Sequence, residues 1–358
     1  MRMCNLKRIA SLVLTLSVII AAVSCEHKEL CYYHPHVAPV RVNVDWSLFP
    51  MDEPTGMTAY AYPLHEDEND IYRFISHNIN YITLELEAGF FHTLVFNQSE
   101  SEYGSFEFTH LEDYNTAQVR VRQTKSNWYA TKAPDTKVGT EPEWLAVGRA
   151  ENIEVTEEMV RIAEEEFLAN RQEQMIRAIG RAINNVATVT PVSVIKQVEF
   201  RVYGEGLYNL RSVRASVDGM AEGCILATGD VTENKVSHTI DTWTIDYIGS
   251  DRSIGDLVAT LGTFGIPSGH TGKPEENKFS IHLMLVDNQT TIDYDFNIGD
   301  ILTEFNELDG SNGELQKVVV KLRLPERLPD VKPVDGEGGG FDIDFDGWGD
   351  EIVTVIPS

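Results

Sequence analysis

Apolar and polar residues alternate along most of the chain, in short stretches separated by turn residues. From Val40 to Trp46, every second residue is apolar, which is the period-2 pattern of a half-buried strand. A glycine-rich stretch around 249–278 interrupts the pattern and predicts an irregular loop. The same alternation predicts further strands near 57–62, 82–86, 91–96, 119–122, 146–155, 198–202, 213–217, 243–247, 279–285, 292–298 and 317–324.

One segment between these strands has a helical period instead. Apolar residues from Met159 to Val186 recur at three- and four-residue spacing. Thr156 is suited to be the N-cap, and Glu157 follows it where the helix dipole favours an anion. Pro191 prevents any continuation. The pattern therefore predicts one long helix or two shorter ones across about 157–186.

The order of these elements predicts a mainly β fold with two β-sandwich domains and a helical segment between them. Ala88-Gly89, between two of the strands, further predicts a hairpin. The predicted segments are a signal peptide at 1–24, a tether at 25–39, an N-terminal β-sandwich at 40–156, a helical connector at 157–190, a C-terminal β-sandwich at 191–324, and a Pro/Gly linker with an acidic C-terminal strand at 325–358.

The first 25 residues have the order of a secretory signal peptide. Basic residues precede an apolar run from Ile9 to Val23, which is short for a membrane-spanning helix. Small residues then lead directly into Cys25, an arrangement that resembles the bacterial lipobox, although Ala22 replaces the usual aliphatic residue. In that family the chain is cut before the cysteine, which is then acylated. Cys25 is therefore the predicted lipidation site, and an ordinary signal peptide followed by a chance cysteine is the alternative.

The net charge argues against several classes of partner. The whole chain carries −27, and without residues 1–24 it would carry −30, because that segment holds three basic residues and no acidic one. A polyanion of this size is repelled by nucleic acid and by anionic lipid headgroups, so we expect no nucleic-acid partner. Acyl chains on Cys25 would instead hold the protein at the membrane. Cys31 and Cys224 could pair, but two cysteines do not make a disulfide framework.

The C-terminal segment beyond the Pro/Gly linker has a second kind of alternation. One face of it is apolar and the other acidic, which predicts a detached strand that needs a sheet to complete. This strand could fold back onto its own domain or add to the sheet edge of another subunit. The candidate donor-strand residues are Phe341, Ile343, Phe345, Ile352, Val353 and Val355.

The acidic positions of the same segment imitate the start of a calcium loop. Asp342, Asp344 and Asp346 have the required spacing and precede a glycine. The twelfth position is Val353, however, where such a loop needs a bidentate glutamate. Calcium is therefore disfavoured, and we predict neither a metal nor another cofactor. The sequence also has no nucleophile elbow, Walker loop, HExxH or GxGxxG motif, so we predict no enzymatic activity.

Four features together resemble the fimbrillin superfamily of Bacteroidetes. They are the lipobox-like end at Cys25, the early strand VRVNVDW, the segment ITLELEAGFFHTLVFNQSE, and VRASVDGMAEGCIL after the strands resume. The resemblance spans most of the chain beyond the signal peptide and is to an uncharacterised, anchor-like branch. It implies two transthyretin-like β-sandwich domains and a non-enzymatic role in adhesion at the outer membrane and cell surface, with other pilus subunits as partners.

The resemblance also raises the question of processing. Shaft pilins of that superfamily lose an N-terminal strand to a protease that cuts after Arg or Lys. Here Arg41 lies inside the first predicted strand, and that strand looks integral to its domain. This departure favours an anchor or minor subunit that keeps its lipid. A tip subunit, or a surface lipoprotein that binds glycan or host protein without polymerising, remains the alternative.

Overall fold

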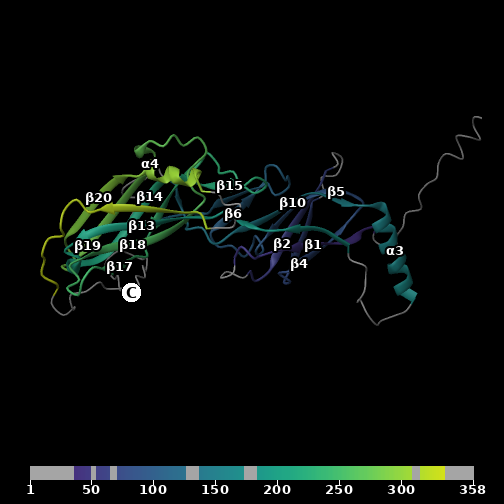
Figure 1. Cartoon of the computed structure of the whole chain (residues 1–358), viewed down its shortest axis with the longest axis horizontal. Coiled ribbons are helices and arrows are strands. Elements are labelled where there is room, and N and C mark those ends of the chain that lie inside the picture. The colour runs from purple at the N-terminus through teal and green to yellow at the C-terminus, as the bar shows by residue number, and fades with distance from the viewer. Residues whose placement is uncertain are drawn as a thin grey trace, which may run out of the picture.

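The molecule is elongated and mainly β, with two lobes joined at a waist (Figure 1). The computed structural model describes residues 36–49, 54–64, 71–125, 137–172, 184–308 and 315–334. The predicted mainly β fold is confirmed. Each lobe contains two facing sheets, and a smaller sheet lies between the lobes.

The N-lobe is built from two sheets that bury one core between them. Its first sheet has the order β11 (Asn184–Val189), β1 (Ala38–Val44), β4 (Tyr81–Leu86), and its second the order β12 (Val192–Ser193), β10 (Ala146–Val155), β5 (Gly89–Phe96), β2 (Met57–Pro63), β3 (Tyr72–Ser76). The predicted alternation places Val40, Val42 and Leu84 on the inner face of the first sheet, where they are fully buried. Phe91 and Val95 belong to the same core from the second sheet.

The C-lobe repeats this plan with longer strands. One sheet has the order β17 (Thr244–Tyr247), β18 (Ile254–Thr263), β13 (Lys196–Glu205), β21 (Lys317–Arg323), and the other the order β20 (Thr291–Asn297), β19 (Lys278–Leu285), β14 (Leu210–Ala221), β16 (Lys235–Ile240), β9 (Val138–Gly139), β8 (Gln123–Thr124). Phe200 and Phe279 stack 4.6 Å apart between the sheets, and Trp243 packs beside them. Short helical turns complete the lobe at η1 (Leu207–Asn209), η2 (Pro274–Glu276), α4 (Gly299–Leu302) and η3 (Thr303–Asn306).

A junction sheet connects the lobes through residues distant in sequence. Its order is β15 (Gly223–Ile225), β7 (Gln118–Val121), β6 (Phe106–Thr109), so a strand from the second half of the chain pairs with strands from the first. Figure 1 shows β15 and β6 at the waist. A third core lies here and draws on both halves, from Tyr60 to Phe264. The two lobes are therefore joined by continuous packing as well as by the chain.

The helix α3 (Glu157–Gln172) begins as predicted but lies elsewhere than between the lobes. The Thr156 hydroxyl accepts a hydrogen bond from the Met159 N–H at 3.2 Å, which confirms Thr156 as the N-cap. Figure 1 shows α3 at the outer end of the N-lobe, where Val160 packs into the core beside β1. The helical connector predicted to reach residue 190 is wrong from residue 184 onward. There β11 runs parallel to β1 and buries Val189, because tertiary pairing overrides the helical spacing.

Two further local predictions differ from the structure. The segments 82–86 and 91–96 are strands but do not form a hairpin, because β4 joins the first N-lobe sheet and β5 the second. The short connection at Glu87-Ala88 is exposed and takes the chain from one sheet to the other at the edge of the core, so both strands contribute apolar residues to that core. The region 249–278 is not one irregular loop, since β18 occupies 254–263 and pairs along its length with β13. Its alternating Leu257, Ala259 and Leu261 face the C-lobe core.

The described chain enters and leaves the molecule at opposite ends. His36, the first described residue, contacts Glu164 of α3 at the outer end of the N-lobe. After β21, residues 324–334 cross the far end of the C-lobe, shown in yellow in Figure 1. Asp330 bonds to Tyr208 and Asn209 there, and the Val334 N–H donates to the Val286 carbonyl.

His238 makes stability depend on pH. It is completely buried in β16, and this burial lowers the pKa of its imidazole to about 4. The unfolded chain binds a proton on His238 below about pH 6.5, whereas the folded chain binds it only near pH 4. The free energy of unfolding therefore falls as the pH is lowered from 6.5 to 4. We expect this difference in proton binding to lower the free energy of unfolding by up to about 3 kcal/mol between pH 6.5 and pH 4.

Urea unfolding at several pH values measures this effect. His238→Gln should flatten the pH dependence in that window, whereas the same change at the exposed His110 should leave it intact. Equal pH profiles for the wild type and His238→Gln would contradict the assignment.

Candidate functional site

The functional residues predicted from sequence lie outside the described residues. These are the lipidation site Cys25, the tail positions Phe341, Ile343, Phe345, Ile352, Val353 and Val355, and the disfavoured calcium positions Asp342, Asp344 and Asp346. They stay predictions. Cys31 also lies outside, while Cys224 is a free, buried thiol in the junction sheet. Burial raises the pKa of that thiol to about 12, so Cys224 stays protonated and unreactive at neutral pH.

The first strand, which bears on processing, is central to its sheet. β1 pairs with β11 on one side and with β4 on the other, and Arg41 lies opposite Asn185 and Thr83. The Arg41 guanidinium stacks 4.0 Å from the centre of the Tyr81 ring. β1 is therefore paired along both of its edges, with an irregularity in its pairing to β11 between Arg41 and Val42. A protease could cut after Arg41 only if β1 left the sheet.

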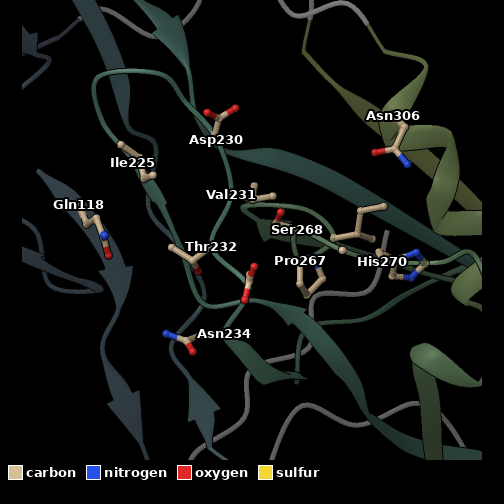
Figure 2. Close-up of a pocket in the computed structure, with 13 residues that line it drawn as sticks. Gln118, Ile225, Asp230, Val231, Thr232, Asn234, Pro267, Ser268, His270 and Asn306 are labelled. Atoms are coloured by element: carbon tan, nitrogen blue, oxygen red, sulfur yellow. The ribbon is translucent and has the colours of Figure 1, made fainter. Parts of the chain in front are cut away.

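A groove at the waist is a cavity that sequence analysis did not anticipate. It has a volume of about 660 Å³. We call it the waist groove. Figure 2 shows Gln118 and Asn306 on opposite sides of it, with the 230–234 loop and Pro267-Ser268 between them. Gln118 belongs to β7 of the junction sheet and Asn306 to η3 of the C-lobe, so the groove needs both parts of the molecule. Its lining residues are Gln118, Ile225, Asp230, Val231, Thr232, Glu233, Asn234, Ile266, Pro267, Ser268, Gly269, His270 and Asn306.

One wall, residues 266–272, is held rigid by His270. The buried His270 ring bonds through Nε2 to Asn277 Oδ1 at 2.8 Å, and its Nδ1 accepts the Gly272 N–H at 3.1 Å. The same Nδ1 also lies 3.1 Å from Glu276 Oε2. The Glu276 carboxylate accepts the N–H groups of Thr271 and Gly272, and the Thr271 hydroxyl also bonds to it. These hydrogen bonds lower the pKa of Glu276, chiefly through the Thr271 hydroxyl.

The neighbouring part of the lining, residues 225–234, is fixed to both lobes. The Ile225 N–H donates to the Asp230 carbonyl at 2.8 Å, closing a turn that Arg149 of β10 holds through a 2.7 Å bond to the Leu226 carbonyl. The two segments are joined directly, because the Ser268 N–H donates to the Thr232 carbonyl at 3.2 Å. Both segments are thus fixed before any ligand binds, which lowers the ordering cost of binding.

The groove offers hydrogen bonding and little positive charge. Amides, hydroxyls and two carboxylates line it, and neither Lys nor Arg appears among its described lining residues. The Thr232 hydroxyl oxygen is buried and has no partner among the described residues. Such a site can bind a polar, uncharged ligand but has no cation to pair with an anion.

Sequence analysis missed the groove because no local pattern marks it. Its residues come from four separate segments, and each lies in a loop, in a helical turn or at a strand end. The nearest signal was the segment VRASVDGMAEGCIL, which ends in β15 beside the groove.

A metal site and a membrane-spanning helix were also considered for the part of the chain that the structure describes. Within those ranges, no three His, Cys, Asp or Glu side chains converge as metal ligands. Over the same ranges, no helix is both long and apolar enough to cross a bilayer.

Comparison with known proteins places the chain in a family. A model of a domain of unknown function, DUF5119, matches residues 24–241, which is more than half of the chain. The chain belongs to the DUF5119 family. The matched range includes all of the N-lobe and continues to the end of β16 in the C-lobe. No protein of curated function matches this DUF5119 sequence.

Solved structures show the fold that the DUF5119 chain shares. A candidate adhesin from Bacteroides ovatus is similar with a TM-score of 0.51 and 14% identity, over 86% of this chain and 99% of that one. The fold implied by the fimbrillin resemblance is thereby confirmed. Weaker matches include a candidate adhesin from Bacteroides thetaiotaomicron (TM-score 0.48, 11% identity, 81% of this chain and 93% of that one) and the fimbrial anchor protein Mfa2 from Porphyromonas gingivalis (TM-score 0.43, 11% identity, 80% and 90%).

Proposed function

We propose that this protein is a lipid-anchored, adhesin-like subunit of the outer membrane and cell surface, acting as a fimbrial anchor or minor structural subunit. The observation that carries the proposal is the central place of β1 in its sheet. Val40 and Val42 are fully buried, so removal of the strand would open the N-lobe core and unpair β4 and β11. While β1 stays in its sheet, a cut after Arg41 does not separate the N-lobe from Cys25.

The arrangement of the two ends suits an anchor. The chain enters beside α3 at one end of the molecule, and the last described residues lie at the other. Lipid on Cys25 would hold the N-lobe end at the membrane, and the acidic strand beyond residue 340 would project from the C-lobe end. There it would add to a sheet edge of another pilus subunit.

The fold supports a structural, non-enzymatic role. One solved structure that matches with a TM-score above 0.5 is a candidate adhesin. The described residues offer a polar groove and no converging set of metal ligands, and the sequence carries none of the catalytic motifs sought. A fold does not determine a function, and the proposal therefore rests on β1 and the two ends of the chain.

Replacing Cys25 with Ala tests the anchor. The change should move most of the protein from the membrane fraction to the soluble fraction, because burial of acyl chains contributes about 0.8 kcal/mol per CH₂. Cys31→Ala is the matched control, since it removes a cysteine six residues away and should leave the protein in the membrane fraction. Membrane retention of Cys25→Ala would contradict the proposal.

A surface lipoprotein that binds a ligand without polymerising is the second candidate. The waist groove favours it, because a rigid polar cavity at the junction of two lobes is a usual place for a ligand. Anchoring through Cys25 is common to both candidates, whereas only the first requires the C-terminal strand to engage another subunit.

A further inference from the structure

We propose that the waist groove binds a short, neutral oligosaccharide through hydrogen bonds. This goes beyond the anchoring role and holds whether or not the protein assembles with other subunits. The volume of about 660 Å³ lies within the range of roughly 300–1,000 Å³ typical of small-molecule sites.

The hydrogen-bonding groups of the groove match a ligand with many hydroxyls. The amides of Gln118, Asn234 and Asn306 each provide donors and an acceptor, and the hydroxyls of Thr232 and Ser268 can do either. Within the described ranges, none of these five side chains makes a hydrogen bond to protein. A sugar hydroxyl also donates and accepts, so adjacent ring positions can pair with such a mixed set.

The apolar part of the groove fits the same kind of ligand. Val231, Ile266 and Pro267 contribute aliphatic surface among the polar groups. A pyranose ring has C–H faces between its hydroxyls and can pack on small aliphatic patches while its hydroxyls bond at the sides.

Charge selects a neutral ligand over an anionic one. Asp230 and Glu233 line the groove, and no Lys or Arg lines it among the described residues. A sialylated or sulfated glycan would meet these carboxylates without a cation to pair with. The His270 ring does not provide that cation for a ligand, because both of its nitrogens already bond within the lining, to Asn277 and Gly272.

Charge also disfavours a cationic peptide. Asp230 attracts the guanidinium of Arg149, which lies in the protein behind the groove wall. Arg149 therefore offsets part of the negative charge of Asp230, and Glu233 is the other, exposed carboxylate of the lining. A single exposed carboxylate contributes little to binding a peptide in salt.

A glycan array probed with the full chain in detergent tests the proposal. The array should hold neutral oligosaccharides together with their sialylated and sulfated counterparts. We expect binding to one or more neutral glycans and no preference for the anionic forms. Calorimetric titration with the neutral oligosaccharide that binds best then gives the affinity of each variant.

Variants of the lining residues locate the binding. Gln118→Ala and Asn234→Ala should each weaken the neutral oligosaccharide about fivefold, and the double variant more than either, because each change removes a hydrogen bond. Gln289→Ala, in an exposed turn of the C-lobe, is the matched control and should bind as the wild type does. The melting temperature of every variant should stay that of the wild type.

Several outcomes would overturn the proposal. These are no binding to any neutral glycan, a preference for anionic glycans, or wild-type affinity in the double variant. A lysine-rich peptide that binds more tightly than any neutral glycan, with an affinity that falls steeply with salt, would show that the groove binds a cationic ligand instead. For the neutral sugar, affinity at 50 and 500 mM NaCl should differ by less than about twofold.

Discussion

Deleting residues 341–358 is expected to abolish association with other pilus subunits while both lobes unfold as before. The C-lobe core is closed by β21, and residues 324–334 are already bonded across its end. The deleted segment should therefore contribute little to folding and much to assembly. Cross-linking in the source cells measures association, and calorimetry of the purified chain measures unfolding.

Two further variants separate the faces of this segment. Replacing Phe341, Ile343 and Phe345 with Asn should reproduce the loss of association, because an added strand gains its affinity by burying alternate side chains. Replacing Asp342, Asp344 and Asp346 with Asn is the matched control, which keeps the apolar face and should retain association. If the deletion instead lowers the unfolding temperature of the C-lobe, the strand folds back within its own chain and strand donation is wrong.

Gly223→Ala is expected to be the most damaging small change at the waist. A Cβ at this position would lie 2.1 Å from the Val119 carbonyl oxygen and 2.9 Å from the Arg120 Cα, both backbone atoms of the paired strand. Neither atom can move without separating β15 from β7. We expect a loss of about 2–3 kcal/mol of unfolding free energy, in the range of overpacked cores.

The matched control for this change is Gly104→Ala. A Cβ there meets only the Glu143 carboxylate at 3.7 Å, an ordinary contact. Denaturant unfolding should show a near wild-type value for Gly104→Ala, and hydrogen exchange in Gly223→Ala should accelerate at Val119 and Cys224. Wild-type stability of Gly223→Ala would contradict the close approach of β15 to β7 at this position.

The alternation of apolar and polar residues identified most strands because each sheet has one face in a core. It failed where pairing with a distant strand determined the secondary structure. Val186 fits the helical period, yet it lies in β11, since β1 offers a parallel partner. In β18, glycine obscured an alternation of smaller apolar residues, and Gly255 is required there because a Cβ would lie 2.5 Å from the Asp246 carbonyl oxygen.

Strand pattern alone also does not determine which sheet a strand joins. The segment that contains β4 and β5 has the alternation and the glycine of a hairpin. The two strands nevertheless belong to different sheets, β4 to the first N-lobe sheet and β5 to the second. The waist groove depends on such choices, because it forms only when β15 pairs with β7 and brings residues 118 and 225 together. No local motif contains that information.

The central claim is that the working protein keeps β1 and its lipid. Mass spectrometry of the mature N-terminus, on protein isolated from the cell envelope, tests it most directly. The account predicts a chain that starts at an acylated Cys25 and continues without a break through Arg41. An unmodified chain that starts near Val42 would contradict it.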